Sequence, residues 1–307
     1  MLSKTIRIGT RDSELALWQA NTVAEKLNDL GYTTEIVPVK STGDIILDKP
    51  LYELGITGIF TKTLDVAMLS GQVDIAVHSM KDVPTALPQG IVQAAVLERA
   101  NVLDILVHKG KLNFLETEGT IATGSLRRKA QWLNKYPTHK VEDLRGNVNS
   151  RMQKLKDNNW DGAIFAAAGL ERINLKPSEY INLDWMIPAP AQGAMLVVAM
   201  ENDSFSREAL AQLNHTETEI CTLIERQFLR TLEGGCTAPI GALATVKENT
   251  ISFEGVLFSL DGKESYTIKK SCNFDSYKNF GTDCAEELLQ NGAKPLMEKL
   301  RSELKVK

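Results

Sequence analysis

The stretch IRIGTRDSELAL at residues 6–17 decides the fold, because a strand pattern gives way there to a helix pattern. Residues 6–10 read as a short strand, and Asp12 or Ser13 is suited to cap the helix that follows. That helix has one largely apolar face as far as Leu30, and Gly31 is suited to end it. The chain is therefore expected to open with a strand followed directly by a helix.

The same alternation of strands and helices continues as far as residue 200. Further strands are predicted at residues 33–39, 73–77, 104–108, 120–123, 140–144, 163–166 and 195–200. Further helices are predicted at residues 61–69, 125–133 and 148–156. Strands that alternate with helices favour mainly parallel α/β sheets that are covered on both faces.

The last part of the chain has a different pattern and predicts a small α+β domain. A long helix is expected at residues 217–232, and residues 251–268 then alternate between apolar and polar positions. Asp261-Gly262 lies between the alternating runs, as in a hairpin. Two helices are expected to cover this sheet, at residues 284–289 and 295–304.

Length and composition restrict the class of protein. The 307 residues are too many for one core, so two or three domains are expected. Hydrophobic residues make up 43%, charged residues 24%, and the formal net charge is −4, which argues against a general nucleic-acid or membrane-surface binder. Neither a signal peptide nor a membrane-spanning segment is expected.

Four cysteines occur, and their spacing predicts no metal site. No C-x-x-C motif occurs, and no histidine stands at zinc-ligand spacing from a cysteine. A reduced, cytoplasmic protein fits this usage. Cys236 differs from the other three because it lies in EGGCTAPIG (residues 233–241), a glycine-rich turn that can present a thiol outward. The alternative is a small apolar residue at a helix end.

Two further features suggest chemistry on acidic ligands. Arginines recur where predicted strands give way to turns or helices, at Arg11, Arg127, Arg128, Arg145, Arg151 and Arg172. Guanidinium groups bind carboxylates through two parallel hydrogen bonds and stay charged at any working pH, although each arginine alone could be a solvated surface charge. Asp82 follows Lys81 just after the strand at residues 73–77, either as a functional carboxylate or as a turn residue.

Four motifs in order make the chain similar to the porphobilinogen deaminase family. They are HSMKD at residues 78–82, LRR at 126–128, LRGN at 144–147 and EGGC at 233–236. The resemblance covers nearly the whole chain. It implies two domains like those of type II periplasmic binding proteins around a cleft, plus a small C-terminal α+β domain. The implied boundaries are residues 1–98 with 194–214, residues 99–193, and residues 215–307.

The resemblance also implies an activity. The family's enzymes are transferases that condense four porphobilinogen molecules, with loss of ammonia, onto a covalent dipyrromethane primer and release hydroxymethylbilane. Asp82 then takes the catalytic role, and Cys236 anchors the dipyrromethane through a thioether. Phe60 matches an aromatic residue of a loop beside the cofactor. The residues that match cofactor- or substrate-binding positions are Arg11, Ser13, Gln19, Ser79, Lys81, Thr123, Ser125, Arg127, Arg128, Arg145, Arg151 and Arg172. A cytoplasmic monomer is implied, with porphobilinogen as its ligand.

Three departures from the family's pattern remove a charged or polar side chain. Glu53 and Thr57 stand where the family commonly has lysines, so the loop after Leu51 carries less positive charge. Gly124 replaces a serine and removes one hydroxyl donor. Two rival functions remain at this point. A periplasmic solute-binding protein would share the two-domain cleft, and a cysteine hydrolase or acyltransferase would need a base close to Cys236.

Overall fold

The computed structural model describes residues 4–40, 61–232 and 238–305. Glu53, Thr57, Phe60 and the EGGC motif with Cys236, all discussed above, lie outside the described residues. Internal contacts group the described chain into two compact units. The first holds residues 4–40, 61–100 and 193–219, and the second holds residues 101–192, 220–232 and 238–305.

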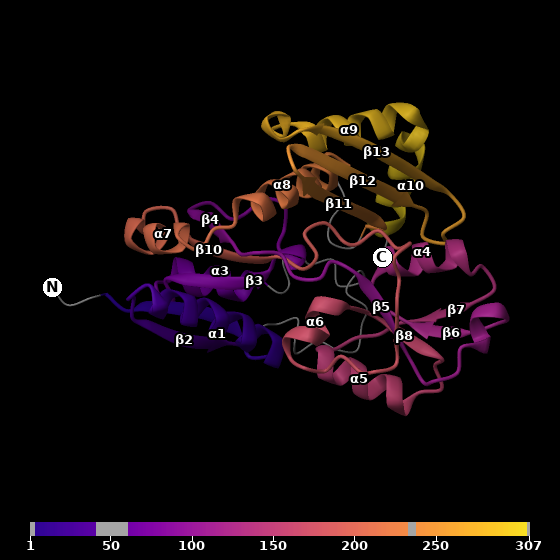
Figure 1. The fold of residues 1–307 in the computed structure, drawn as a ribbon, viewed down its shortest axis with the longest axis horizontal. Coiled ribbons are helices and arrows are strands. Elements are labelled where there is room, and N and C mark those ends of the chain that lie inside the picture. Colours follow the sequence, from indigo (N-terminus) through magenta and orange to yellow (C-terminus); the bar gives the residue numbers. More distant parts are fainter. Residues whose placement is uncertain (1–3, 41–60, 233–237, 306–307) are drawn as a thin grey trace. The chain divides into compact units, whose positions relative to one another are not determined.

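A mainly parallel five-stranded sheet forms the centre of the first unit (Figure 1). In spatial order its strands are β2 (Thr34–Val39), β1 (Ile6–Arg11), β3 (Ile75–Ser79), β10 (Met195–Met200) and β4 (Ile91–Val96). Strand β1 is parallel to β2 and β3, whereas β10 is antiparallel to β3 and β4. The carboxyl ends of β1 and β3 therefore lie at the same edge of the sheet.

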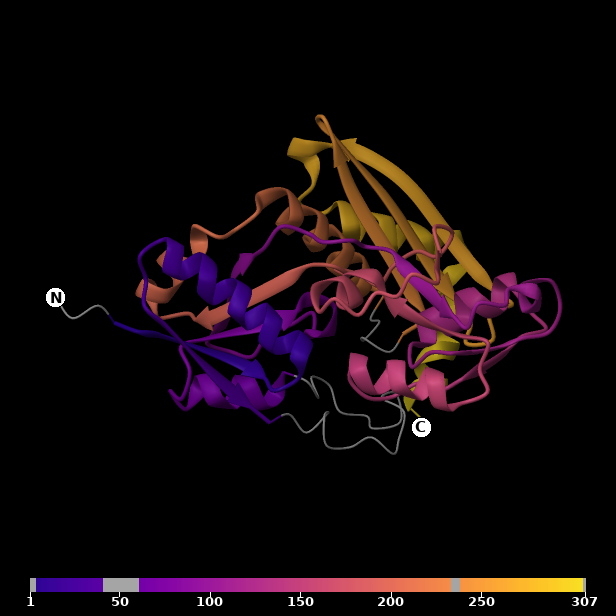
Figure 2. The same ribbon diagram turned by 60° about the horizontal axis from the view of Figure 1, so that its bottom comes forward.

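Helices pack on both faces of this sheet because its strand residues alternate in direction. The helices of this unit include α1 (Glu14–Asp29), α3 (Lys62–Leu69) and α7 (Ser204–Ala211). On one face Ile8 of β1 packs in a buried cluster with Leu27 of α1, and Figure 2 shows α1 lying along the strands. On the other face a Cβ added to Gly9 would come within 3.1 Å of Leu64 in α3, so this helix sits close to the backbone of β1.

The second unit contains a sheet with the same strand order. Its strands are β7 (Lys140–Glu142), β6 (Thr120–Ala122), β8 (Gly162–Ala166), β5 (Asp104–His108) and β9 (Tyr180–Asn182). Here β5 is the strand that runs against its neighbours β8 and β9. In both sheets the reversed fourth strand is one that follows a crossing of the chain from one unit to the other. This repeated topology confirms the expected α/β fold of two type II periplasmic-binding-protein-like domains.

Three helices cover this second sheet. They are α4 (Leu126–Lys135), α5 (Val148–Asp157) and α6 (Ala167–Arg172). Phe165 of β8 packs with Leu155 of α5 on one face, whereas the neighbouring Ile164 packs with the fully buried Trp132 of α4 on the other. The alternation along β8 thus places α4 and α5 on opposite faces.

The C-terminal part of the second unit is the small α+β domain predicted from the sequence. Its antiparallel strands are β11 (Ile240–Lys247), β12 (Thr250–Phe258) and β13 (Ser265–Asn273), and its helices are α8 (Thr216–Thr231), α9 (Phe280–Leu288) and α10 (Lys294–Lys305). Phe228 of α8 lies so close to β12 that a Cβ on Gly255 would be 2.6 Å from its ring. The residues that carry Cys236 connect α8 to β11.

The turn between β12 and β13 also contacts α4. Asn134 donates a hydrogen bond from Nδ2 to the carbonyl oxygen of Gly262 at 2.8 Å, and Gly262 has a φ of +73°. A Cβ at this position would lie 2.3 Å from the carbonyl oxygen of Ala130. Glycine is therefore required both by the backbone conformation and by the close approach. None of the described helices is long and apolar enough to cross a membrane.

Candidate functional site

The carboxyl edge of the first sheet carries the predicted site residues of the first unit. Arg11 ends β1 and Ser79 ends the neighbouring strand β3. Ser13 is the N-cap of α1, and its Oγ accepts a hydrogen bond from the Ala16 N–H at 3.4 Å. The end of β1 and the start of α1 therefore place a guanidinium group and a hydroxyl group at one edge of the sheet.

Gln19 fixes the hydroxyl group of Ser79. Its side chain is only 2% exposed, and its Nε2 donates to the Oγ of Ser79 at 3.0 Å. This hydrogen bond joins the inner face of α1 to the end of β3. Gln19 is therefore a buried residue that holds the Ser79 side chain in place, and it does not lie on an open surface.

Asp82 lies on a short 3-10 turn, η2 (Met80–Asp82), directly after β3. Buried residues at the two ends of this turn, Met80 and Val83, hold it in place. Met80 is 2% exposed and donates its N–H to the carbonyl oxygen of Ala194 at 3.1 Å, and Val83 is equally buried. Lys81 and Asp82 between them stay half-buried. Burial of the two apolar neighbours thus holds a carboxylate and an ammonium group at the sheet edge.

His78 of β3 is almost fully buried beside this turn. Burial, together with the positive charge of Arg11, lowers the pKa of the His78 imidazole to about 4. The ring is therefore neutral at physiological pH. This favours a supporting role for His78 over one as a proton donor.

In the second unit the end of β6 continues into the N-terminus of α4. Ser125 caps this helix, because its Oγ accepts from the Arg128 N–H at 3.4 Å. Thr123 is 2% exposed, and its Oγ1 accepts from the Ser125 N–H at 3.3 Å. Both predicted hydroxyl groups therefore take part in the local turn.

The LRGN motif forms the neighbouring turn, after β7. Gly146 has a φ of +110°, and Asn147 caps α5 by accepting from the Ser150 N–H at 2.9 Å. Arg145 in this turn is 6% exposed, and Arg151 lies half-buried on α5. Because β6 and β7 are parallel neighbours, this turn and the Thr123–Ser125 turn end at the same sheet edge.

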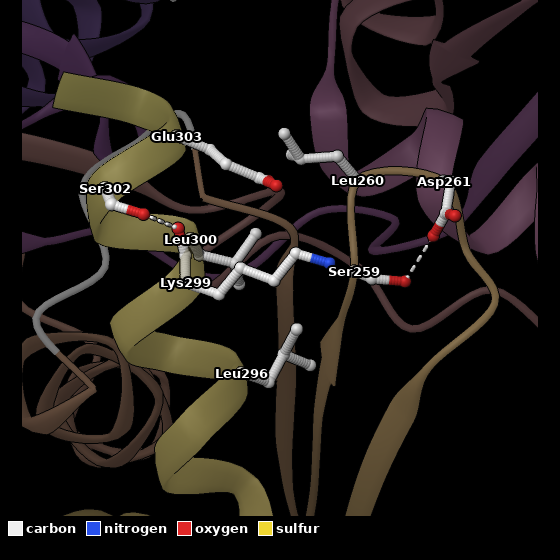
Figure 3. Close-up of a pocket in the computed structure, with 8 residues that line it drawn as sticks. All are labelled: Ser259, Leu260, Asp261, Leu296, Lys299, Leu300, Ser302 and Glu303. Carbon is white, nitrogen blue, oxygen red and sulfur yellow. Dashed lines mark hydrogen bonds between the residues drawn. The ribbon is translucent and has the colours of Figure 1, made fainter. Parts of the chain in front are cut away.

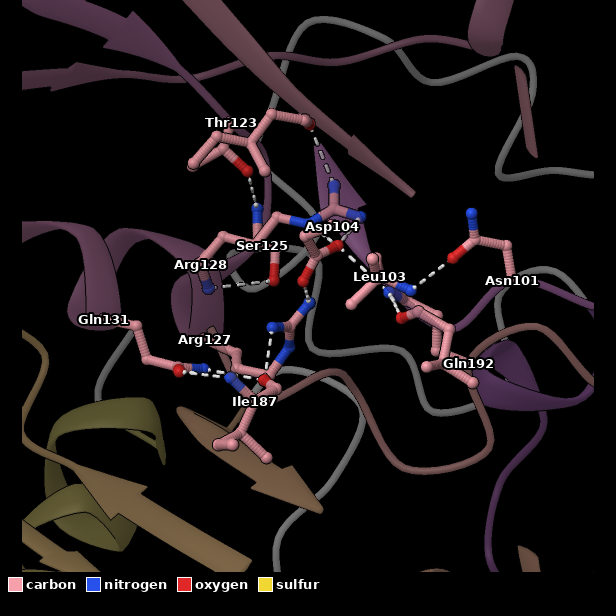
Figure 4. Close-up of polar contacts among 12 residues, drawn as sticks. Asn101, Leu103, Asp104, Thr123, Ser125, Arg127, Arg128, Gln131, Ile187 and Gln192 are labelled. Atoms are coloured by element: carbon pink, nitrogen blue, oxygen red, sulfur yellow. Dashed lines mark hydrogen bonds and ion pairs between the residues drawn. The ribbon is translucent and has the colours of Figure 1, made fainter. Parts of the chain in front are cut away.

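Arg127 and Arg128 are more deeply buried than residues on an open cleft wall would be. Both guanidinium groups bind Asp104, with Nη2 of Arg127 on Oδ2 and Nη2 of Arg128 on Oδ1, each at 2.8 Å (Figure 4). Nη1 of Arg127 also donates to the carbonyl oxygen of Ile187 at 2.7 Å, and Nη1 of Arg128 to that of Ile164 at 3.0 Å.

Asp104 was missed by the sequence analysis. The available signal was an acidic residue at the start of the apolar strand DILVH, where a buried charge needs a partner. Arg172 ends α6, a helix that was not predicted from the sequence. Burial lowers the pKa of the Arg172 guanidinium to about 10, against the opposing effect of Glu171, so the group is still charged at neutral pH.

A pocket of about 590 Å³ lies elsewhere in the second unit, between α10 and the residues after β12 (Figure 3). Its lining includes the apolar side chains of Leu296 and Leu300, the carboxylates of Asp261 and Glu303, and the ammonium group of Lys299. None of the predicted site residues lines it. This pocket is therefore not the candidate site.

Comparison with known protein families distinguishes the porphobilinogen deaminase family from the two rival functions, a solute-binding protein and a cysteine hydrolase or acyltransferase. Residues 6–208 match the model described as porphobilinogen deaminase, dipyromethane cofactor binding domain, and residues 219–290 match that of the porphobilinogen deaminase C-terminal domain. The chain belongs to the porphobilinogen deaminase family. A porphobilinogen deaminase of Desulforamulus reducens is 42% identical over 97% of this chain and 98% of its own, and one of Pelotomaculum thermopropionicum is 40% identical over 98% and 99%.

Among solved structures the chain is similar to the periplasmic VFT2 domain of Bordetella pertussis BvgS. The match covers 68% of this chain and 86% of that domain, with 12% identity and a TM-score of 0.43. The methionine-binding protein MetQ matches 68% of this chain and 89% of its own, with 14% identity and a TM-score of 0.41.

The described residues fit the cofactor for which the porphobilinogen deaminase model is named. Dipyrromethane carries acetate and propionate groups, and the two buried guanidinium groups of Arg127 and Arg128 share a single carboxylate. Arg127 is 4% exposed, and its Nε has no hydrogen-bond acceptor among the described residues. A carboxylate would supply both the missing acceptor and the missing negative charge. Within the described ranges, no group of histidine, cysteine and acidic side chains is arranged to hold a metal ion.

Proposed function

We propose that this chain is a porphobilinogen deaminase in tetrapyrrole and haem biosynthesis. It is a transferase that joins four porphobilinogen molecules head to tail with loss of ammonia, and it then releases hydroxymethylbilane by hydrolysis. One observation carries this proposal. Asp82 lies at a sheet edge that also carries Arg11 and Lys81, in a chain that matches the family's cofactor-binding domain.

The cationic side chains bind the carboxylates of the substrate. Porphobilinogen has an acetate and a propionate, and each added ring brings two more carboxylates. Arginine holds such groups with planar, paired hydrogen bonds. Arg145, Arg151 and Arg172 serve this role in the second unit, and Arg11 and Lys81 serve it in the first.

Asp82 stabilises the positive charge that develops as ammonia leaves porphobilinogen. An ionised carboxylate beside the resulting methylene-pyrrole cation lowers the energy of the transition state. The same carboxylate can hydrogen-bond the pyrrole N–H, and it can receive the proton that the newly joined ring loses. Its half-buried position leaves it accessible to a ligand.

Cys236 anchors the cofactor and is not a turnover nucleophile. A dipyrromethane bound to its sulfur supplies the pyrrole carbon that accepts each substrate unit. Ser13, Thr123 and Ser125 hold carboxylates of this group through their hydroxyl groups, and Phe60 stacks on a pyrrole ring.

The finer assignments are part of the same proposal. The enzyme acts as a monomer in the cytoplasm, which agrees with its cysteine usage. Its three domains divide at residues 98/99, 193/194 and 214/215, close to the unit boundaries at residues 100/101 and 192/193.

Turnover of porphobilinogen by the purified protein tests the function. The expected stoichiometry is four porphobilinogens consumed and four ammonia molecules released for each tetrapyrrole formed. Binding of porphobilinogen without release of ammonia would instead support a solute-binding protein.

A further inference from the structure

Asp104 accepts hydrogen bonds from two other side chains and forms an ion pair with a third. It opens β5 with 0% exposure. Its Oδ1 accepts from Nε and Nη2 of Arg128 at 2.9 and 2.8 Å and from Nε2 of Gln192 at 3.0 Å, while its Oδ2 binds Nη2 of Arg127 at 2.8 Å. A buried carboxylate is tolerated because it is paired and hydrogen-bonded in this way.

These donors come from separate parts of the chain. Arg127 and Arg128 lie in the first turn of α4, whereas Gln192 lies where the chain crosses back to the first unit. The Nε2 of Gln192 also donates to the carbonyl oxygen of Val102 at 2.8 Å, just after the first crossing. Asp104 therefore joins both crossing segments to the helix that carries the two arginines, as Figure 4 shows.

The far side of Arg127 is fixed by the returning segment. Nη1 of Arg127 and Nε2 of Gln131 both donate to the carbonyl oxygen of Ile187, at 2.7 and 2.9 Å. The N–H of Ile187 donates to Oε1 of Gln131 at 2.8 Å. Gln131 thus holds both backbone groups of Ile187, and the guanidinium group of Arg127 is bound on two sides.

This cluster has one positive charge that its own residues do not balance. Two guanidinium groups carry two positive charges, and Asp104 balances one of them. Neither Gln131 nor Gln192 contributes charge. The cluster is therefore buried, hydrogen-bonded and net positive, which suits groups that must stay in place while an acidic ligand binds.

We propose that Asp104 is a positioning residue of the deaminase reaction. It sets the orientation of the Arg127 and Arg128 guanidinium groups toward the carboxylates of the bound chain, and it holds Gln192 beside them. The proposal rests on the proposed function for its catalytic part. Its structural part, that Asp104 fixes the two guanidinium groups, stands on the contacts alone.

Asp104→Asn tests this proposal, with Asp74→Asn as the matched control. Asp74 is also a largely buried carboxylate, and it binds Nε and Nη2 of Arg7 at 3.0 and 2.9 Å. It precedes β3, so it lies at the sheet edge opposite the predicted site residues. Both substitutions remove one charge from an arginine pair, but only the first pair belongs to the proposed site.

Two measurements are made on each purified, full-length variant. For Asp104→Asn we expect kcat/KM for porphobilinogen to fall by about 10²-fold, since displaced binding groups cost this much. The Nε–H proton resonance of Arg128 is expected to shift and to exchange faster with water. For Asp74→Asn we expect both quantities to stay at the wild-type value. Asp104→Glu keeps the charge and should recover part of the activity; it also serves as the second variant if Asp104→Asn does not fold.

An Asp104→Asn enzyme with wild-type kcat/KM would overturn the proposal. So would a loss of activity with unchanged arginine resonances, because Asp104 would then act by another route. If the wild-type protein does not convert porphobilinogen at all, the proposed function fails, and the resonances alone decide whether Asp104 fixes the guanidinium groups.

Discussion

A Cβ added to Gly124 would lie 2.4 Å from the carbonyl oxygen of Leu144. The turn after β6 and the turn after β7 thus touch at this point, and only a residue without a side chain allows the observed distance. In the family's pattern a serine stands at this position, so Gly124 lacks a hydroxyl group. In the structure the two turns are so close that there is no room for a side chain at position 124.

We therefore predict that Gly124→Ser and Gly124→Ala are harmful to the same extent. Each added Cβ must push the turns apart, at a cost of about 1–3 kcal/mol in the free energy of unfolding. Displacement of Arg145 in the second turn should lower kcat/KM in both variants. Urea unfolding and steady-state kinetics measure these effects. A serine variant clearly more active than the alanine variant would mean that the missing hydroxyl group matters more than the packing.

His78 should make the protein less stable in acid. Its pKa is about 4 in the folded state and 6.5 in the unfolded chain, so the unfolded state binds the proton more tightly. Stability from the neutral ring is complete above pH 6.5 and is lost as the pH falls toward 4, by about 3 kcal/mol. We predict that His78→Gln unfolds with a shallower pH dependence over this window. Equal slopes for both proteins in urea titrations at pH 7, 5.5 and 4.5 would refute this.

Asp82→Asn should lower the activity strongly and leave the free energy of unfolding nearly unchanged. The carboxylate is half-buried on η2, and the turn is anchored by Met80 and Val83 instead. Loss of its charge and of its capacity to accept a proton should lower kcat by about 10²–10⁴-fold. Asp29→Asn, at the exposed end of α1, is the control and should leave kcat unchanged. A fully active Asp82→Asn enzyme would remove Asp82 from the mechanism.

Thr57→Lys tests the departure in the loop after Leu51. A lysine here restores a charge that the family commonly has, so KM for porphobilinogen should fall by about two- to fivefold, in line with the small energy of one exposed ion pair. The gain should shrink as salt is added. Thr57→Gln controls for side-chain length without charge. An unchanged KM in the lysine variant would count against a role for this position in substrate binding.

Much of the fold could be predicted because local signals agree with tertiary packing. Strand β5 and strand β10 have the predicted bounds, and Ser13 caps α1 as expected. Strand β11 was not predicted because it contains glycine and alanine where a strand usually has larger residues. Glycine is present at position 241 because of a tertiary contact: a Cβ there would lie 2.8 Å from the carbonyl oxygen of Ile187.

The site could be predicted in outline but not in its contacts. Arginines at strand ends are visible in the sequence, since parallel strands finish at one edge of a sheet. That Arg127 and Arg128 converge on a single carboxylate is not visible, because adjacent helix positions ordinarily diverge and Asp104 lies on another strand. Burial and pairing of this kind depend on the assembled sheet.

The intact mass of the purified protein, measured beside that of the Cys236→Ala variant, is the most direct test of the covalent dipyrromethane on Cys236. We predict that the wild-type protein, as isolated or after incubation with porphobilinogen, is heavier than its sequence by two linked pyrrole units. The alanine variant should have the unmodified mass. A wild-type protein that stays unmodified after incubation, or an alanine variant that carries the same added mass, would contradict the assignment of Cys236 as the cofactor anchor.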